Sequence, residues 1–111
     1  MVKSLNTIKD MIDQYVKMLE SCIAVDTIIL FGSYSRGTAL EDSDIDLIVI
    51  SDGFTEMPFL KRLEMLELLW PFTDAVEAIG YTKSEYEQYS NELRIASVAR
   101  KEGKEIYRKA A

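Results

Sequence analysis

The sequence predicts an α/β fold in which a small mixed β-sheet packs against α-helices. Short apolar runs rich in β-branched residues, typical of buried strands, recur along the chain. Segments with helical periodicity lie between and around these runs, an alternation that favours a layered α/β arrangement. The chain has 111 residues, which suffice for one hydrophobic core and leave no room for a second module, so we expect a single domain over 1–111.

The expected strands and helices follow from periodicity and from turn residues. The expected strands cover 26–31, 43–51 and 75–81. The expected helices cover 4–22, 33–37, 58–70, 84–89 and about 91–103. Ser4 is suited to cap the first helix, and Cys22 falls on its apolar stripe as a core residue. Ile106 and Tyr107 fit either a terminal edge strand or coil.

The helix over 58–70 is bracketed by Pro58 and Pro71 and carries more apolar residues than one core-facing stripe needs. One interpretation is a well-buried helix packed on the sheet. The other is that Met65, Leu68 or Trp70 protrudes as a contact with a partner or a second subunit, because large exposed apolar patches usually mark interfaces.

The strongest indication of function lies in residues 31–50, which read FGSYSRGTALEDSDIDLIVI. Asp44 and Asp46 stand at the start of the second expected strand and, being two residues apart, point to the same face. Two carboxylates about 4 Å apart repel by several kcal/mol at an effective dielectric constant near 20. A fold keeps such a pair when a cation bridges it or when one acid stays protonated. The pair therefore predicts a divalent metal site, although a D-x-D sequence alone is more commonly a solubilising strand start.

A Gly-Ser turn lies directly before these acids in the sequence. Gly32 permits a tight turn with close backbone approach, and a helix beginning at Ser33 would point backbone N–H groups at an anion. Arg36 lies in the same turn and is the only cation between Lys17 and Lys61. A phosphate-binding turn, paired acids and one arginine together indicate phosphoryl or nucleotidyl transfer, with Gly32, Ser33 and Arg36 as nucleotide-binding residues.

The pattern G-S-x10-D-x-D with flanking apolar residues resembles the nucleotidyltransferase superfamily that includes DNA polymerase β. The longer string GSYSRGTALEDSDIDLIVI is similar to its minimal nucleotidyltransferase branch, as are VEAIGYTKSEYE and ARKEGKEIY. The resemblance covers most of the chain. It implies the nucleotidyltransferase fold, with Mg²⁺ or Mn²⁺ ions held by carboxylates and ATP as the most fitting donor of a nucleoside monophosphate.

The resemblance also implies a third metal carboxylate on the next core strand, where TDAVEAIGY offers two acids. Glu77 lies between Val76 and Ala78, much as Asp46 lies between apolar neighbours. Asp74 is nearer the strand start and alternates onto the opposite face. We favour Glu77 and keep Asp74 as the alternative. Glu77 departs from the Asp that the family usually shows there, but its longer side chain can still bind Mg²⁺.

The charge composition limits the kinds of molecule that the chain can bind. The net charge is −6 and the pI is about 4.6, whereas binding a long nucleic acid requires clustered Lys and Arg. The cations that cluster near the C-terminus fit a helix end and a solvated tail: Arg100, Lys101, Lys104, Arg108 and Lys109. We therefore expect no long nucleic acid substrate.

A single cysteine rules out an internal disulfide and suits a reducing, cytoplasmic compartment. No apolar run is long enough for a membrane span, and we expect no signal peptide. The chain contains no histidine, which excludes histidine acid–base chemistry and most zinc sites. Carboxylate-bound Mg²⁺ or Mn²⁺ is therefore the expected metal.

The main functional hypothesis is a metal-dependent transferase that moves AMP from ATP to an acceptor hydroxyl. Its catalytic and metal-binding acids would be Asp44, Asp46 and Glu77. The rival hypothesis is a catalytically weak or inactive module of the same fold that binds nucleotide or a partner, with Glu77 failing to complete the metal site. A third hypothesis, a small-molecule transferase of the aminoglycoside-modifying kind, is disfavoured because the chain has no room for a substrate domain.

The 111 residues leave little beyond the catalytic core, so we expect the acceptor to be recognised by another subunit through self-association, by a partner protein or in a small open cleft. The resemblance implies a helical partner toxin of the higher-eukaryote-and-prokaryote nucleotide-binding (HEPN) family, with the acceptor hydroxyl on the toxin. That arrangement would make this chain the antitoxin of a toxin–antitoxin system.

Overall fold

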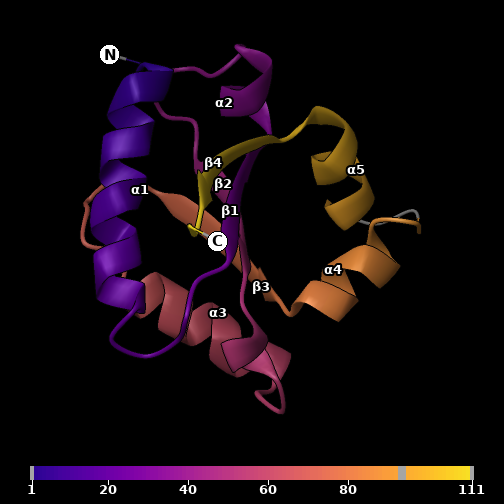
Figure 1. Ribbon diagram of the computed structural model, residues 1–111. Helices are drawn as coiled ribbons and strands as arrows, with labels where there is room; N and C mark the ends of the chain where they lie inside the picture. Colours follow the sequence, from indigo (N-terminus) through magenta and orange to yellow (C-terminus); the bar gives the residue numbers. More distant parts are fainter. Residues whose placement is uncertain (1, 93–94, 111) are drawn as a thin grey trace.

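The computed structural model describes residues 2–92 and 95–110 and contains a four-stranded mixed sheet with helices on both faces (Figure 1). The strands are β1 (Thr27–Phe31), β2 (Ile45–Ile50), β3 (Val76–Tyr81) and β4 (Lys104–Arg108). The helices are α1 (Leu5–Leu19), α2 (Ser33–Arg36), the 3-10 helix η1 (Asp52–Phe54), α3 (Phe59–Leu68), α4 (Lys83–Tyr89) and α5 (Ile95–Glu102). This architecture confirms the α/β prediction.

The strands lie in the order β3-β2-β1-β4. Strand β1 pairs antiparallel with both β2 and β4, whereas β2 and β3 run parallel, so the sheet is mixed. Figure 1 shows α1 on one side of the strands and the α4–α5 arm on the other. Side chains alternate along each strand, so Leu47 and Val49 pack on the α1 side while Ile48 and Ile50 form a second cluster with α5.

Helix α1 begins as predicted, because the Ser4 hydroxyl accepts a hydrogen bond from the Thr7 backbone N–H at 3.1 Å. Its apolar face is buried through Leu19. The prediction that Cys22 fills the core is wrong, since the helix ends at Leu19 and Cys22 lies exposed in the following turn. A stripe extrapolated beyond the end of its helix does not predict burial.

Helix α3 is less buried than its composition predicts. Arg62 and Leu66 are its buried residues, whereas Leu68 is 83% exposed. Met65 and Trp70 pack partly against the core. Of the three residues offered by the second interpretation, Leu68 protrudes, whereas Met65 and Trp70 are partly buried; a contact between Leu68 and a partner stays a prediction.

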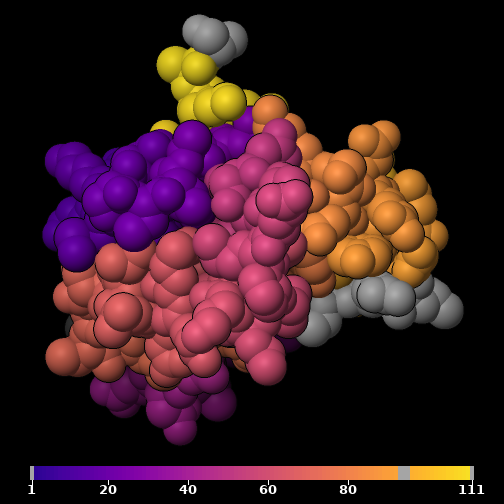
Figure 2. Space-filling model, turned by 90° about the horizontal axis from the view of Figure 1, so that it is seen from below, coloured from indigo at the N-terminus to yellow at the C-terminus, as the bar shows by residue number. Residues whose placement is uncertain are grey.

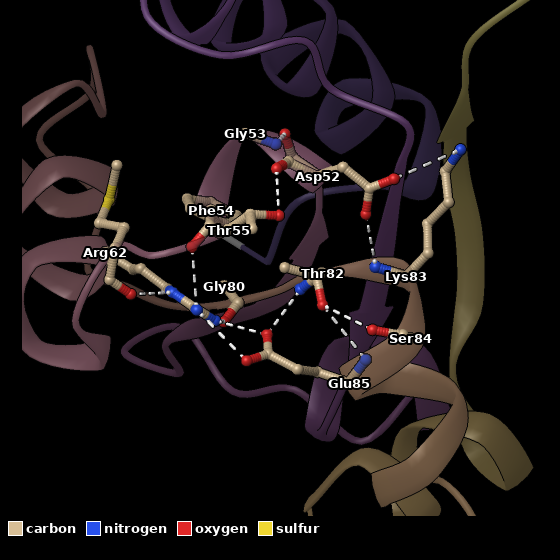
Figure 3. A network of polar contacts seen from close by, with 12 residues as sticks. Asp52, Gly53, Phe54, Thr55, Arg62, Gly80, Thr82, Lys83, Ser84 and Glu85 are labelled. Carbon is tan, nitrogen blue, oxygen red and sulfur yellow. Dashed lines mark hydrogen bonds and ion pairs between the residues drawn. The ribbon is translucent and has the colours of Figure 1, made fainter.

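The buried Arg62 joins α3 to the end of β3 and to α4 (Figure 3). Its guanidinium donates hydrogen bonds to the carbonyl oxygens of Met57, Phe54 and Gly80 at 2.9, 3.0 and 3.2 Å. It also donates to both carboxylate oxygens of Glu85, at 2.6 and 3.2 Å. The sequence analysis missed this residue, because an arginine in an amphipathic helix normally lies at the surface.

The remaining elements lie close to their predicted positions. Ile106 and Tyr107 belong to the edge strand β4, which decides between the two alternatives. Asn91 and Glu92 follow α4 in a turn, so the last helix begins later than predicted, at Ile95; residues 93–94 lie outside the described residues. In the described ranges, the structure has no helix that combines the length and apolar character needed to cross a membrane.

Candidate active site

The Gly-Ser turn connects β1 to the short helix α2 and places its backbone against Asp46. Gly32 has φ of +71°, a region that favours glycine, and a Cβ at this position would collide with the carboxylate oxygen Oδ2 of Asp46. Both the backbone conformation and the close approach therefore require glycine. Helix α2 ends as predicted at Gly37, in the left-handed conformation with φ of +73°.

The buried Ser35 holds the turn in shape, a role that the sequence analysis missed. Its hydroxyl donates a hydrogen bond to the Gly32 carbonyl oxygen at 2.9 Å, and its backbone N–H donates to the same oxygen at 3.1 Å. The Ser33 carbonyl oxygen accepts a hydrogen bond from the Thr38 backbone N–H at 3.0 Å. The three-residue spacing from Gly32 to Ser35, which suits a first-turn hydrogen bond, was the available signal.

The two glycines of this turn provide a matched pair of variants. We expect Gly37→Ala to lower the free energy of unfolding by about 1 kcal/mol, because only its positive φ opposes a side chain and no atom lies within 4 Å of the added Cβ. Gly32→Ala should cost clearly more and also reduce nucleotidyl transfer, because Asp46 must move. Urea unfolding of both variants tests this. Equal losses would show that the contact with Asp46 has no energetic consequence.

Strand pairing brings Asp46 and Glu77 together. Asp46 lies opposite Phe31 on β1 and opposite Glu77 on the parallel strand β3. By alternation, both acids share the sheet face that carries Ile48 and Ile79, and they occupy the part of that face near α2. Two predicted site residues about thirty positions apart thus become neighbours, and one of them touches the Gly32 turn.

The surroundings of Asp46 oppose its ionisation. Burial raises the pKa of Asp46 to about 6, with further increases from the negative charges of Glu77 and Asp44 and from a hydrogen bond with Glu77. The positive charge of Arg36 acts in the opposite direction and lowers the pKa of Asp46. A half-buried acid perturbed by two neighbouring acids is characteristic of functional sites.

A family model described as a nucleotidyltransferase domain matches residues 9–106. The chain belongs to the nucleotidyltransferase domain family. Protein adenylyltransferase MntA of Thermococcus cleftensis is 40% identical over 67 residues, which make up 60% of this chain and 65% of that protein. A Methanocaldococcus jannaschii protein that carries a provisional protein adenylyltransferase name is 40% identical over 68 residues, 61% of this chain and 68% of that protein.

Solved structures support the same fold. A crystal structure from Sulfolobus solfataricus, provisionally named a nucleotidyltransferase, aligns with a TM-score of 0.64 and 21% identity over 95% of this chain and 80% of that chain. A toxin–antitoxin structure with AMP-PNP aligns with a TM-score of 0.53 and 24% identity over 91% of this chain and 73% of that chain. At these identities the likeness shows the nucleotidyltransferase fold.

Three other residues that the sequence indicated for the site, Asp44, Asp74 and Arg36, lie in three different surroundings. Asp44 precedes β2 and is exposed, whereas the sequence predicted it within the strand. Asp74 lies before β3, where its carboxylate forms an ion pair with Lys3 at 2.5 Å. Arg36 forms an ion pair with Glu102 of α5 at 3.4 Å, with both side chains about half exposed. Asp46 therefore has Glu77, rather than Asp74, as its partner on β3.

The carboxylates fit a divalent cation by chemistry. The carboxylates of Asp44, Asp46 and Glu77 offer oxygen donors. The negative charges of Asp44 and Glu77 repel that of Asp46 and raise its pKa, and a bound Mg²⁺ or Mn²⁺ ion would relieve this repulsion. In the described part of the nucleotidyltransferase, no three His, Cys, Asp or Glu side chains already converge to hold a metal ion. The donor set thus fits the ion, while its side chains do not form a closed coordination shell.

Two hollows flank the sheet of the nucleotidyltransferase. A hollow of about 280 Å³ borders the site and is lined by Lys3, Tyr34, Asp42 and Asp74, among others. A larger hollow of about 500 Å³ lies toward the other end of β1 and β2, near Thr27 and Ile50, and the predicted site residues do not line it. The larger of these two hollows therefore lies apart from the paired acids.

Proposed function

We propose that this nucleotidyltransferase transfers the AMP moiety of ATP to a hydroxyl group of a partner protein, with Mg²⁺ or Mn²⁺ as cofactor. The observation that carries the proposal is the contact of the Gly32 turn with Asp46, which lies opposite Glu77. The printed name of the Thermococcus cleftensis relative, protein adenylyltransferase, supports AMP as the transferred group and a protein as the acceptor.

In the proposed reaction the acceptor oxygen attacks the α-phosphorus of ATP. The bond from that phosphorus to the bridging oxygen breaks, and pyrophosphate leaves. Asp44, Asp46 and Glu77 would hold the divalent ions, which when bound polarise the phosphoryl oxygens and stabilise developing charge. Glu77 would also accept the proton of the acceptor hydroxyl. Gly32 and Ser33 would bind the β- and γ-phosphates through the turn, assisted by Arg36.

The proposed partner is a helical toxin of the HEPN type, with this chain as the antitoxin. The structural neighbours include a toxin–antitoxin complex with AMP-PNP and a toxin–antitoxin pair named MntA-HpeT, the latter with a TM-score of 0.50.

Mass spectrometry tests the proposal directly. The chain is incubated with ATP and Mg²⁺ and with the small helical protein that co-purifies with it or is encoded beside it. We expect the helical protein to gain the mass of one AMP. Nucleotide added only to tRNA or to an aminoglycoside would contradict a protein acceptor. Nucleotide binding without any transfer would favour the rival function, an inactive binding module. The observation in favour of that rival is that, in the described residues, the three acids do not converge on a metal position.

A matched pair of variants, one on each side of the start of β3, tests which acid is the third metal ligand. We expect Glu77→Gln to lower the rate of transfer at least about a hundredfold, because it removes one negative ligand and the proton acceptor. Asp74→Asn should leave the rate within about threefold, because Asp74 pairs with Lys3 instead. Transfer rates at saturating ATP measure both. The opposite ranking would assign the third ligand to Asp74.

A further inference from the structure

Helix α3 exposes a contiguous apolar patch formed by Phe59, Leu60 and Leu63. Phe59 is 46% exposed and Leu60 is 71% exposed, while Leu63 is partly buried. Leu63 lies three residues after Leu60 and four after Phe59, spacings that bring each of these two side chains next to Leu63 on the helix surface. Figure 2 looks onto this end of the molecule and shows the atoms of α3 at the surface. Exposed apolar residues gathered in this way usually mark an interaction surface.

The patch borders the sheet face that carries the paired acids. The Phe59 ring lies 6.3 Å from the Tyr81 ring, centroid to centroid, and Leu63 packs on the cluster that contains Ile79 and Tyr81. Glu77, Ile79 and Tyr81 alternate onto one face of β3, with about 7 Å between successive members. The patch therefore lies about 7–13 Å along β3 from Glu77.

One acidic side chain, that of Glu67, lies between the patch and the acids of the site. Helix α3 runs antiparallel to β3, because Phe59 lies near Tyr81 while the Trp70 indole N–H donates to the Asp74 carbonyl oxygen at 2.8 Å. Glu67, exposed and one turn beyond Leu63, thus lies on the path toward Glu77. A segment that reaches from the patch to Asp46 passes Glu67 and ends beside Asp46 and Glu77, so positive charge on the segment would favour its approach.

We propose that this patch docks the acceptor protein, by holding a large apolar side chain of an extended basic segment whose hydroxyl reaches Asp46 and Glu77. This proposal rests on the proposed function. An extended chain spans about 3.3–3.6 Å per residue, so the apolar anchor and the modified hydroxyl lie about two to four residues apart. The patch then selects the acceptor, while the carboxylates carry out the transfer.

Short synthetic peptides test the proposal. Each contains one tyrosine flanked by Lys and Arg, with a leucine about three residues before or after it in one set and serine in its place in the other. Leu60→Glu is the test variant. Met18→Glu is its matched control, because Met18 is similarly solvent-exposed, at 44%, but lies on α1, which packs against the opposite sheet face. Circular dichroism verifies that both variants are folded.

We expect the leucine peptides to have KM values about tenfold below those of the serine peptides. Leu60→Glu should abolish that difference without changing the KM for ATP, and Met18→Glu should preserve it. Transfer that is independent of the leucine or insensitive to Leu60→Glu would overturn the docking surface. Metal-dependent ATP binding by calorimetry without transfer to any peptide would overturn it as well. Absence of ATP binding would instead reject the proposed function on which it rests.

Discussion

Asp46→Asn is expected to lower the rate of nucleotidyl transfer by at least about 10³-fold while leaving the protein folded. A metal ligand stabilises the charge of the transition state by several kcal/mol, and each 1.36 kcal/mol corresponds to a factor of ten in rate. Asp46 is the acid that approaches the Gly32 turn and lies opposite Glu77, so its loss removes the carboxylate at the centre of the proposed site. Single-turnover transfer measured with saturating ATP and Mg²⁺ gives the rate.

The same substitution should stabilise the free protein at neutral pH. The pKa of Asp46 is raised to about 6 from 3.8, so the folded state binds its proton more tightly than the unfolded state does. This stabilising contribution is present below about pH 3.8 and is lost as pH rises through about 6. Because Asp46 is half-buried, we expect only about 1–2 kcal/mol after solvent screening.

Thermal unfolding in the presence and absence of ATP and Mg²⁺ separates the two effects. The wild-type melting temperature should rise with the ligands, and that of Asp46→Asn should not. Asp13→Asn, on the exposed surface of α1, serves as the control and should behave as the wild type. An Asp46→Asn protein that keeps both its ligand-dependent stabilisation and its activity would exclude Asp46 as a metal ligand.

Arg62→Met should produce the largest loss of stability, about 3–5 kcal/mol. The arginine side chain is only 7% exposed and pairs with Glu85, so its removal takes the guanidinium from a partly buried carboxylate and one hydrogen bond from each of three carbonyl oxygens (Figure 3). Lys61→Met is the matched control on the same helix. Its ion pair with Glu64 is about 70% exposed on both sides and contributes at most about 1 kcal/mol.

Urea unfolding at several pH values measures this effect and its origin. The hydrogen bonds from Arg62 lower the pKa of Glu85 below its ordinary value of 4.5, so the pair contributes stability above that pH and loses it as pH falls further. The difference between wild type and Arg62→Met should therefore shrink below about pH 4.5. Equal losses for Arg62→Met and Lys61→Met would contradict a central role for the buried arginine.

Features that depend on neighbouring residues were predictable from the sequence. Alternation along TDAVEAIGY predicted that Glu77 and Asp74 face opposite ways, and the structure brings Glu77 opposite Asp46. The Gly-Ser pair predicted the turn at Gly32, and Gly37 predicted the left-handed end of the short helix, because both depend on backbone conformations that glycine adopts readily. The positions of strands and helices were predictable to within a few residues, because periodicity and turn residues are also local properties of the sequence.

Contacts between side chains that are distant in the sequence depend on the packing of the whole fold. The parallel pairing of β2 with β3 sets Asp46 beside Glu77, and the start of β2 at Ile45 leaves Asp44 exposed. Arg62 is buried because η1, α3, β3 and α4 converge on it, whereas in sequence it resembles any surface arginine. Local periodicity specifies the direction of a side chain within its own element. Its partner depends on the order and register of strands that lie far apart in the chain.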